Sequence, residues 1–349
     1  MSKTPDTIVT GATGLVGRWL VPQLTRQNRQ VMVLIRKSTL RAAAYGRWVE
    51  THGGNPANLS FHDLEMDQDN LGLADIDTSK LRDVYHLVAR YEFGLTRDQA
   101  RRIAVLGSLR LLDWCQSVPK LRRFVFITGY LAATHAETIR QAPIARQQKL
   151  IDKQYRKCGA YEASKVEENI LVQRKAKQLG IPYTIVNPSA ISGDSQTGET
   201  TQFIGPAELV RDIYHGKLPA LVGGADTFVP LVAVDYVAKF MASIPQQSEA
   251  EGQSYWLLDQ ATPNFAKLVA QIGQYLGVDY PKKLIPKLLV RALPRVLSGA
   301  DPEALVFMTN LRYDTKNADK LAKKMAIAQP EFRSSLENWI DFLVSRSAS

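Results

Sequence analysis

Tyr161 and Lys165 have the side-chain types and the spacing that proton-transfer chemistry requires. They stand four positions apart in Tyr161-Glu162-Ala163-Ser164-Lys165, so on a helix their side chains lie on one face. An ammonium beside a phenol stabilises the phenolate and lowers the pKa of the phenol. Tyr161 could then give a proton to a carbonyl oxygen as a hydride arrives, or accept one in the reverse direction. A Tyr and a Lys at this spacing are also common for structural reasons, so the rest of the chain has to support the assignment.

A glycine-rich segment near the N-terminus supplies that support. Thr10-Gly11-Ala12-Thr13-Gly14-Leu15-Val16-Gly17 follows a short apolar strand and opens a helix. The first glycine permits a tight turn, the second lets the backbone approach a pyrophosphate, and the third allows the helix to pack on the strand. The helix N-terminus then faces the phosphate charge. We therefore expect a dinucleotide site bordered by Gly11, Thr13, Gly14, Leu15, Val16 and Gly17.

The end of the second expected strand indicates which dinucleotide binds. A fold that prefers NAD places an Asp or Glu there, on the ribose hydroxyls. This chain has Arg36 and Lys37, and Arg36 lies nineteen residues after Gly17. Two cations at this place favour an adenosine 2′-phosphate through charge-assisted hydrogen bonds. The sequence thus predicts NADP(H), and the alternative is that the pair is surface charge.

Alternating strands and helices have to position these residues. Apolar, β-branched runs predict strands over 7–10, 31–35, 59–62, 83–88, 124–127 and 183–187, and helical periodicity predicts helices over 15–27, 97–116 and 161–179. This alternation is typical of a doubly wound parallel sheet, a Rossmann fold in the α/β class. We expect residues 1–191 to form the cofactor-binding and catalytic core. Residues 192–349 are expected to form mostly a smaller C-terminal substrate lobe, with a returning strand near 228–238.

Composition and charge restrict the class of protein. Hydrophobic residues make up 45% and charged residues 22%, as in ordinary globular proteins. Two cysteines are too few for a disulfide framework, and five scattered histidines without ligand spacing predict that there is no metal site. The N-terminus resembles neither a signal nor a transit peptide, and no apolar run is long enough for a membrane span, so we expect a cytoplasmic protein.

The net charge of +10 favours anionic partners such as phosphorylated cofactors, acyl carriers or acidic lipid surfaces, unless it is only a solvated basic surface. Nucleic acid is not expected, because no basic stretch is interleaved with aromatic residues. The segment 280–297, YPKKLIPKLLVRALPRVL, mixes basic and apolar residues. It is interpreted as a broken surface helix, a mobile wall of the substrate pocket, or a face that contacts an anionic membrane surface.

Together these motifs resemble the extended short-chain dehydrogenase/reductase superfamily over almost the whole chain. The resemblance rests on the glycine fingerprint, Asp63-Leu64, His86-Leu87-Val88-Ala89, Tyr161 with Lys165, Asn187-Pro188-Ser189, Val229-Pro230 and Val234-Asp235-Tyr236-Val237-Ala238. Three details are similar to the branch that contains thioester-reductase domains and fatty acyl-CoA reductases: Arg36, Asn70-Leu71-Gly72-Leu73, and Gly193-Asp194-Ser195-Gln196-Thr197-Gly198.

The resemblance implies roles for further residues. Asp63 and Leu64 would contact the adenine, Val88 and Ala89 would line the ribose and phosphates, and Pro188 to Ala190 would lie on the nicotinamide side. Lys165 would also hold the nicotinamide ribose, and Tyr161 would border the cofactor.

Two positions depart from the family pattern. The catalytic Ser or Thr position falls on Gly129, and Thr128 stands one residue earlier. The Asn of the fourth helix, to which the family assigns a proton relay, corresponds to Ala104. Thr128 is therefore the candidate hydrogen-bond donor to the substrate oxygen.

The leading hypothesis is an NADPH-dependent reductase that delivers hydride to a ketone, aldehyde or acyl thioester of a hydrophobic or acyl-type substrate. A sugar-nucleotide epimerase or dehydratase on the same scaffold is the enzymatic alternative, although Thr128-Gly129-Tyr130 offers no acidic pair. A protein that binds NADP(H) without turnover is the non-enzymatic alternative.

Overall fold

The computed structural model describes residues 4–65, 71–88, 94–292 and 304–346. The chain divides into two compact units. The first comprises Met1–Asn187 and Ala238–Tyr255, and the second comprises Pro188–Val237 and Trp256–Ser349.

A seven-stranded sheet forms the centre of the first unit, with the strand order β10-β6-β5-β4-β1-β2-β3. Neighbouring strands from β3 to β6 pair in parallel. The bonds Ile185 N to Gln253 O and Ser189 N to Leu257 O run in the same direction along β6 and β10, as in a parallel pair. The strands are β1 (Thr7–Thr10), β2 (Val31–Ile35), β3 (Leu59–Asp63), β4 (Asp83–His86), β5 (Arg123–Ile127), β6 (Tyr183–Pro188) and β10 (Ser254–Leu257). The predicted doubly wound α/β fold is confirmed.

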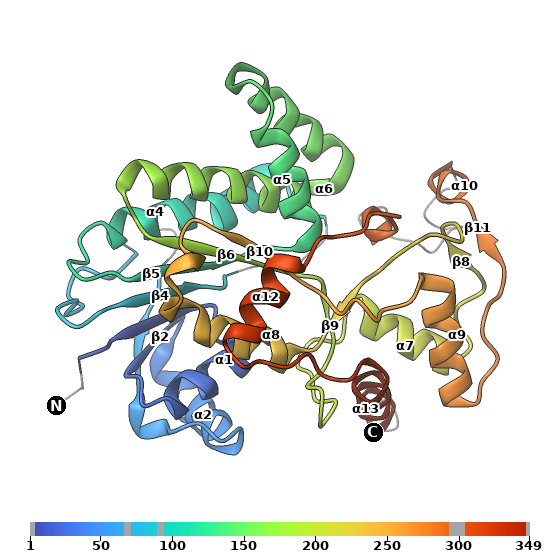
Figure 1. The fold of residues 1–349 in the computed structure, drawn as a ribbon, viewed down its shortest axis with the longest axis horizontal. Helices are drawn as coiled ribbons and strands as arrows, with labels where there is room; N and C mark the ends of the chain where they lie inside the picture. Colours follow the sequence, from blue (N-terminus) through green and yellow to red (C-terminus); the bar gives the residue numbers. More distant parts are fainter. Residues whose placement is uncertain (1–3, 66–70, 89–93, 293–303, 347–349) are drawn as a thin grey trace. The chain divides into compact units, whose positions relative to one another are not determined.

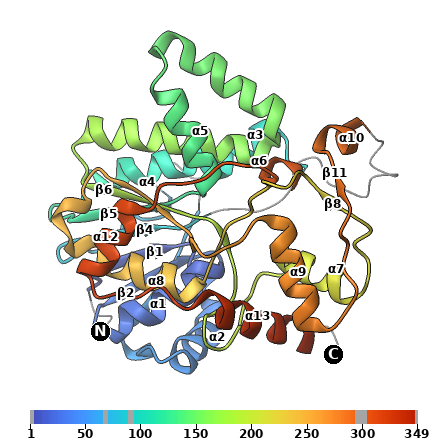
Figure 2. The same ribbon diagram turned by 45° about the vertical axis from the view of Figure 1, so that its right-hand side comes forward.

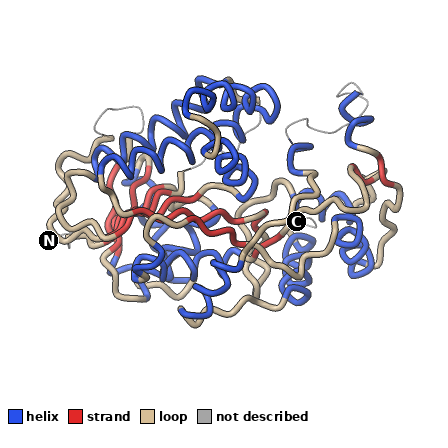
Figure 3. Tube along the Cα trace, turned by 45° about the horizontal axis from the view of Figure 1, so that its top comes forward, coloured by secondary structure: helices blue, strands red, loops and turns tan. Residues whose placement is uncertain are grey.

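Helices cover both faces of this sheet (Figure 1), and Figure 3 shows the strands as a layer between helices. On one face lie α1 (Leu15–Arg26), α2 (Ser38–Thr51) and α8 (Val234–Ser243), and on the other lie α4 (Gly107–Cys115), α5 (Tyr130–Arg140) and α6 (Ile144–Leu179). A continuous stretch of α3 (Arg97–Ala100) and a π-helical segment (Arg101–Leu106) leads into α4. The first unit also holds short 3₁₀ turns at Pro56–Asn58, Ile244–Gln246 and Ser248–Ala250.

The core between the sheet and the α4/α6 layer is apolar because the strands are buried on both faces. Strands β1, β4, β5 and β6 contribute Ile8, Val84, Phe124, Phe126 and Ile185, and the helices contribute Leu111, Leu112, Cys115, Val172 and Ala176. This packing fixes the carboxyl ends of the strands, where open α/β sheets carry their ligands.

Helix α6 is interrupted directly before the Tyr161 motif. Gly159 has φ +78° and ψ 169°, a non-helical conformation that glycine adopts readily. The helix therefore breaks at Gly159 and restarts just ahead of Tyr161. The two parts of α6 are joined across the break, since the Tyr155 hydroxyl donates to Glu167 at 2.7 Å. Glu167 also accepts from Arg101 of the π-helical segment at 2.8 Å. The predicted helix over 161–179 is thus the second part of a longer element.

The second unit is held by three helices around one apolar cluster (Figure 2). These are α7 (Pro206–Tyr214), α9 (Phe265–Leu276) and α13 (Phe332–Ser345), and the cluster includes Val210, Ile213, Leu268, Ile272, Trp339 and Ile340. Two small sheets pair β7 (Ala190–Ile191) with β9 (Leu231–Val232) and β8 (Leu221–Val222) with β11 (Leu284–Ile285). The other elements within the described residues of this unit are α10 (Lys287–Ala292), a 3₁₀ turn at Ala304–Phe307 and α12 (Lys316–Lys324).

The observed units differ in detail from the division predicted between residues 191 and 192. The first unit stops at Asn187 and takes in Ala238–Tyr255. The segment 228–238 holds the short β9 and the start of α8, while β10 joins the large sheet about twenty residues later. The apolar run around Val234 is β-branched, but it continues with helical periodicity into Phe240 and Met241, and the helix prevails.

Among the described helices, none combines the length and the apolar character that crossing a membrane requires. The segment 280–297 lies only partly within the described residues, which stop at 292 in this region. Within its described part, Leu288 and Leu289 are exposed, and Lys287 donates to the Met308 carbonyl at 3.2 Å.

Candidate active site

The glycine loop at the end of β1 has the backbone geometry of a phosphate cradle. Gly11 has φ +70°, and a Cβ there would lie 2.5 Å from the Leu87 carbonyl carbon. A Cβ on Gly17 would lie 2.5 Å from the Ala12 Cα. Helix α1 has no acidic residue in its first turn, and Gly14, its exposed N-cap, has no side chain to satisfy the first N–H groups. These N–H groups therefore remain available to a phosphate, and the loop fits a dinucleotide.

Side chains from α2 and α1 keep this loop in shape. The buried Tyr45 hydroxyl donates to the Ala12 carbonyl at 2.9 Å, and Arg18 Nε donates to the Thr13 carbonyl at 3.2 Å. The Arg18 guanidinium also lies 4.7 Å from the ring centre of Trp48. These two hydrogen bonds bind carbonyl groups of the loop, so the N–H groups of the loop remain available to the ligand.

Arg36 and Lys37 stand exposed at the end of β2, where the sequence predicts the adenosine phosphate. Lys37 has φ +55°, which turns the chain between β2 and α2. Asp63 fixes this turn from the end of β3, because its carboxylate accepts from Ser38 N at 2.7 Å and from Ser38 Oγ at 3.1 Å. The Ser38 hydrogen bonds lower the pKa of Asp63. The observed contacts of Asp63 are thus with Ser38, in the turn that carries Arg36 and Lys37. Its contact with adenine stays a prediction.

The remaining predicted cofactor residues are spread over both units. The Leu64 side chain is buried in the core, so that only its backbone is available to a ligand. Val88 is half-buried, and Ala89 lies outside the described residues. Pro188 ends β6, and Ala190 begins β7 in the second unit. The roles assigned to these residues stay predictions.

Lys165 is a buried cation held by two acceptors. Its ammonium donates to Glu168 Oε2 at 2.7 Å and to the Val88 carbonyl at 3.3 Å. Tyr161 is half-buried one helical turn earlier, and its carbonyl accepts from Ser164 Oγ at 2.7 Å. The helix restart at Gly159 therefore places the phenol at the beginning of the helix and the ammonium one turn inside it.

Glu162 is a buried acid beside this pair. Burial raises its pKa from 4.5 to about 7, and the nearby Lys165 opposes the shift. Its Oε1 atom is buried with no hydrogen-bond partner. An unpaired buried carboxylate is costly, so the neutral acid is favoured below about pH 7.

Thr128 lies at the end of β5 in a network of side chains. Its hydroxyl donates to Asn187 Oδ1 at 2.5 Å and accepts from Asn169 Nδ2 at 3.1 Å. Asn187 Nδ2 in turn donates to Ser254 Oγ at 2.8 Å. Because a hydroxyl has one hydrogen, Thr128 can donate to a substrate oxygen only by exchanging Asn187 for it. The donor role of Thr128 stays a prediction with that condition.

The two positions that depart from the family pattern have defined surroundings. Gly129 is the N-cap of α5 with φ −133°, and a Cβ there would meet no atom within 4 Å. Ala104 is buried in the π-helical segment, and its carbonyl oxygen lies 2.6 Å from Ser108 Oγ. Gly129 therefore has room for a hydroxyl side chain, whereas Ala104 contributes through its backbone.

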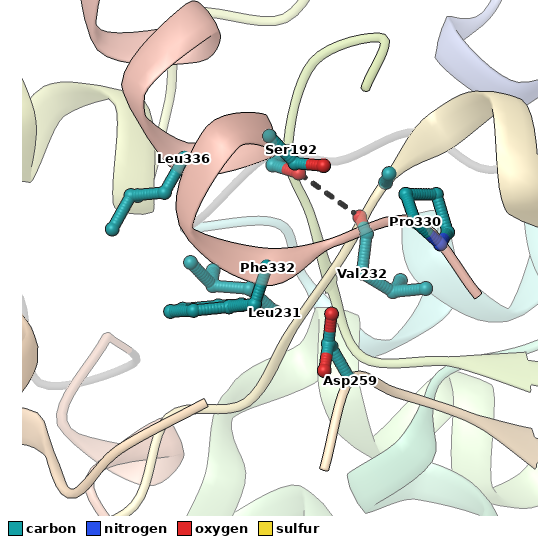
Figure 4. A pocket seen from close by; sticks show the side chains of 9 residues that line it. Ser192, Leu231, Val232, Asp259, Pro330, Phe332 and Leu336 are labelled. Carbon is teal, nitrogen blue, oxygen red and sulfur yellow. Dashed lines mark hydrogen bonds between the residues drawn. The ribbon is translucent and has the colours of Figure 1, made fainter. Parts of the chain in front are cut away.

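A small pocket in the second unit is lined by none of the predicted site residues. Ser192, Leu231, Asp259, Phe332 and Leu336 line it, and Ser192 Oγ donates to the Val232 carbonyl at 3.2 Å (Figure 4). Burial raises the pKa of Asp259. No sequence pattern predicted this pocket, because its residues come from four separate segments.

The Gly193–Gly198 motif packs on α13 in the same unit. Gly198 has φ +68°, and a Cβ there would lie 2.0 Å from the Asn338 carbonyl oxygen. Asn338 Nδ2 donates to the Ser195 carbonyl at 3.0 Å, and Ser195 Oγ donates to Asp235 at 3.0 Å. These contacts assign the motif a structural role within its unit.

The structure also brings residues to Lys165 that sequence reasoning missed. Glu168 contacts Lys165 directly, and Ser108 and His86 follow behind Glu168. The spacing of three between Lys165 and Glu168 places both on one helical face, and this was the available signal for Glu168. Ser108 and His86 lie on other elements, so no local spacing connects them.

Comparison with known families identifies the scaffold. A model of NAD-binding proteins, described as "Male sterility protein", matches residues 9–241. The chain belongs to this family. The matched range contains the glycine loop, Arg36, Thr128, Tyr161 and Lys165.

Two relatives and one solved structure are similar to the chain over most of its length. The chain is 26% identical over 292 residues to "Putative dihydroflavonol 4-reductase" of Synechocystis sp., covering 80% of this chain and 74% of that protein. It is 28% identical over 306 residues to "Sterol demethylase protein B" of Methylococcus capsulatus, covering 84% and 79%. The terminal R domain from the myxalamid biosynthetic pathway has a TM-score of 0.76 at 19% identity, with 100% and 93% coverage, and shows the shared fold.

The chain is therefore an oxidoreductase of the extended short-chain dehydrogenase/reductase superfamily, in the male sterility family. It has the superfamily's nicotinamide dinucleotide-binding domain.

Proposed function

We propose that this protein is an NADPH-dependent reductase that transfers hydride to the carbonyl of a hydrophobic or acyl-type substrate. The observation that carries the proposal is the combination of a phosphate-binding loop, the exposed Arg36 and Lys37, and the buried Lys165 one turn after Tyr161. When bound, NADPH supplies the hydride. Multiple-turnover oxidation of NADPH with a panel of ketones, aldehydes and acyl thioesters tests the proposal, and the absence of turnover with all three classes would contradict it.

The residues of the chain would bind the cofactor and transfer the proton. The loop from Gly11 to Gly17 would hold the pyrophosphate on its N–H groups, and Arg36 with Lys37 would hold the 2′-phosphate. Tyr161 would give its proton to the substrate oxygen, and Lys165 would stabilise the resulting phenolate and hold the nicotinamide ribose. The hydrophobic or acyl character of the substrate is supported by the branch of the family and by the relatives whose names refer to a flavonoid and a sterol.

Cofactor choice gives the first prediction. Arg36→Asp should weaken NADPH binding at least tenfold, about 1.4 kcal/mol, because it replaces a favourable charge contact with a repulsive one. NADH binding should change less, since NADH lacks the 2′-phosphate. Titration of both cofactors against wild type and variant measures this, with Arg41→Asp as the matched control on the neighbouring exposed surface of α2. A wild-type protein that prefers NADH would contradict the assignment.

The hydroxyl at the end of β5 gives the second prediction. Thr128→Val should lower turnover about tenfold with little change in NADPH affinity, because it removes one hydrogen-bond donor that Asn187 already occupies. Thr128→Ser keeps the hydroxyl and should retain activity. Gly129→Ser places a hydroxyl at the family's usual position, where there is room for it. An unchanged turnover in Thr128→Val, with a gain in Gly129→Ser, would show that Thr128 is not the donor.

Two alternatives differ from this proposal in measurable ways. A sugar-nucleotide epimerase or dehydratase would convert its substrate without net oxidation of NADPH, and the cation pair at Arg36 and Lys37 and the missing acidic pair beside Thr128 disfavour it. A binding protein without turnover would bind NADPH and reduce none of the carbonyls.

Contact with an anionic membrane surface stays a prediction. It is supported by the exposed Leu288 and Leu289, which are close in sequence to the lysines of 282–287.

A further inference from the structure

A chain of buried hydrogen bonds extends from Lys165 through the layer between α6, α4 and the sheet. Lys165 Nζ donates to Glu168 Oε2 at 2.7 Å, and Ser108 Oγ lies 2.5 Å from Glu168 Oε1. His86 Nε2 lies 2.7 Å from Ser108 Oγ, and His86 Nδ1 lies 2.7 Å from Thr10 Oγ1. All five residues are buried, and Glu168, Ser108 and Thr10 are fully so.

In this series of hydrogen bonds, every donor can point towards Glu168. A carboxylate is the strongest acceptor present, so the Ser108 hydroxyl donates to it in preference to the Ala104 carbonyl. His86 is neutral, because burial lowers its pKa to about 3. Its Nε2–H then donates to Ser108, and its Nδ1 accepts from the Thr10 hydroxyl. Lys165 and the Ser108 hydroxyl favour the charged form of Glu168, while burial, the largest effect, raises the pKa of that carboxyl.

We propose that Glu168 is the counter-ion of Lys165 and a positioning residue. Held by Ser108 and His86, it keeps the Lys165 ammonium in place and weakens the electrostatic effect of that ammonium on the Tyr161 phenol. The inference rests on the proposed function for its catalytic meaning. An anchored ammonium keeps its place throughout a reaction cycle, whereas an unpaired lysine side chain has several rotatable bonds. A neutralising partner also weakens the stabilisation of a phenolate at Tyr161.

The titratable and charged groups around this pair come from several elements. On α6 itself these are Tyr161, Glu162 and Glu167; β4 contributes His86, which is neutral, and the π-helical segment contributes Arg101. Glu167 is already paired with Arg101 and accepts from Tyr155. Glu167 therefore offers a matched control: it is a second buried glutamate on the same helix, and its hydrogen bonds join it to Arg101 and Tyr155.

The test is a titration of the Tyr161 phenolate by its ultraviolet absorbance, taken as the difference between each protein and its Tyr161→Phe counterpart. Glu168→Gln keeps the shape and the capacity to hydrogen-bond Lys165 and Ser108, but it removes the negative charge. The Tyr161 transition should move about one pH unit lower in Glu168→Gln, and less in Glu167→Gln. The alkaline limit of NADPH-dependent turnover should move in the same direction. An unmoved transition, or one displaced upwards, would overturn the proposal.

Thermal unfolding provides a second measurement that requires no activity. Lys165→Met leaves the buried Glu168 without its counter-ion and should lower Tm, and adding Glu168→Gln to Lys165→Met should recover part of the loss. A double variant less stable than Lys165→Met would contradict the pairing. If the Tyr161 titration and the Tm values change as expected but no carbonyl is reduced, the pairing of Glu168 with Lys165 is supported and the proposed function is contradicted.

Discussion

Replacement of Tyr161 by Phe should lower turnover by roughly 100- to 10,000-fold, the range that a general acid contributes. The variant keeps the ring and removes the hydroxyl that would protonate the substrate oxygen. Folding should be retained, since Tyr161 is half-buried at the restart of α6. Steady-state kinetics with NADPH and an active carbonyl measures the loss.

Two further variants define what the Tyr161 result means. Tyr155→Phe is the matched control, because it removes a hydroxyl from the same helix that donates only to Glu167. It should affect stability more than turnover. Lys165→Ala should damage both turnover and NADPH binding, because Lys165 has both roles in the proposal. An undiminished Tyr161→Phe enzyme would overturn the catalytic assignment as a whole.

Replacement of Glu162 by Gln should change how stability depends on pH. The folded protein holds a proton on Glu162 up to about pH 7, whereas the unfolded chain loses it near 4.5. The folded state therefore binds more protons between these values, and the free energy of unfolding falls as the pH rises through this range. A shift of this size corresponds to about 3 kcal/mol. Gln carries no charge and avoids the loss.

Urea unfolding of wild type and Glu162→Gln at pH 4.5 and pH 8 measures this difference. The two proteins should be similarly stable at the acidic pH, and the variant should be more stable by about 3 kcal/mol at pH 8. Glu167→Gln is the control, because its carboxylate is paired with Arg101 and its loss should destabilise the protein at pH 8. Parallel stability curves for wild type and Glu162→Gln would show that Glu162 is ionised in the folded state.

The sequence by itself determined the sheet and the two local motifs. The strands at 7–10 and 31–35 were predicted to the residue, because alternation of apolar runs and turn residues is a local signal. The glycine loop and the pair Tyr161 and Lys165 were predictable for the same reason: their chemistry lies in spacings of three or four along one segment. The family follows from these motifs in their order along the chain, and the comparison confirms it.

Only the tertiary structure decided what surrounds those motifs. Asp63 turned out to fix Ser38, Thr128 to donate to Asn187, and Glu168 to connect Lys165 with residues of α4 and β4. The partners in these pairs are 25, 59 and 60 positions apart. A buried polar side chain needs a hydrogen-bond partner, and that partner can come from any element that packs against it. Contacts between different strands and helices produce no periodic pattern in the sequence. For the same reason the high pKa of Glu162 became visible only once its burial was known.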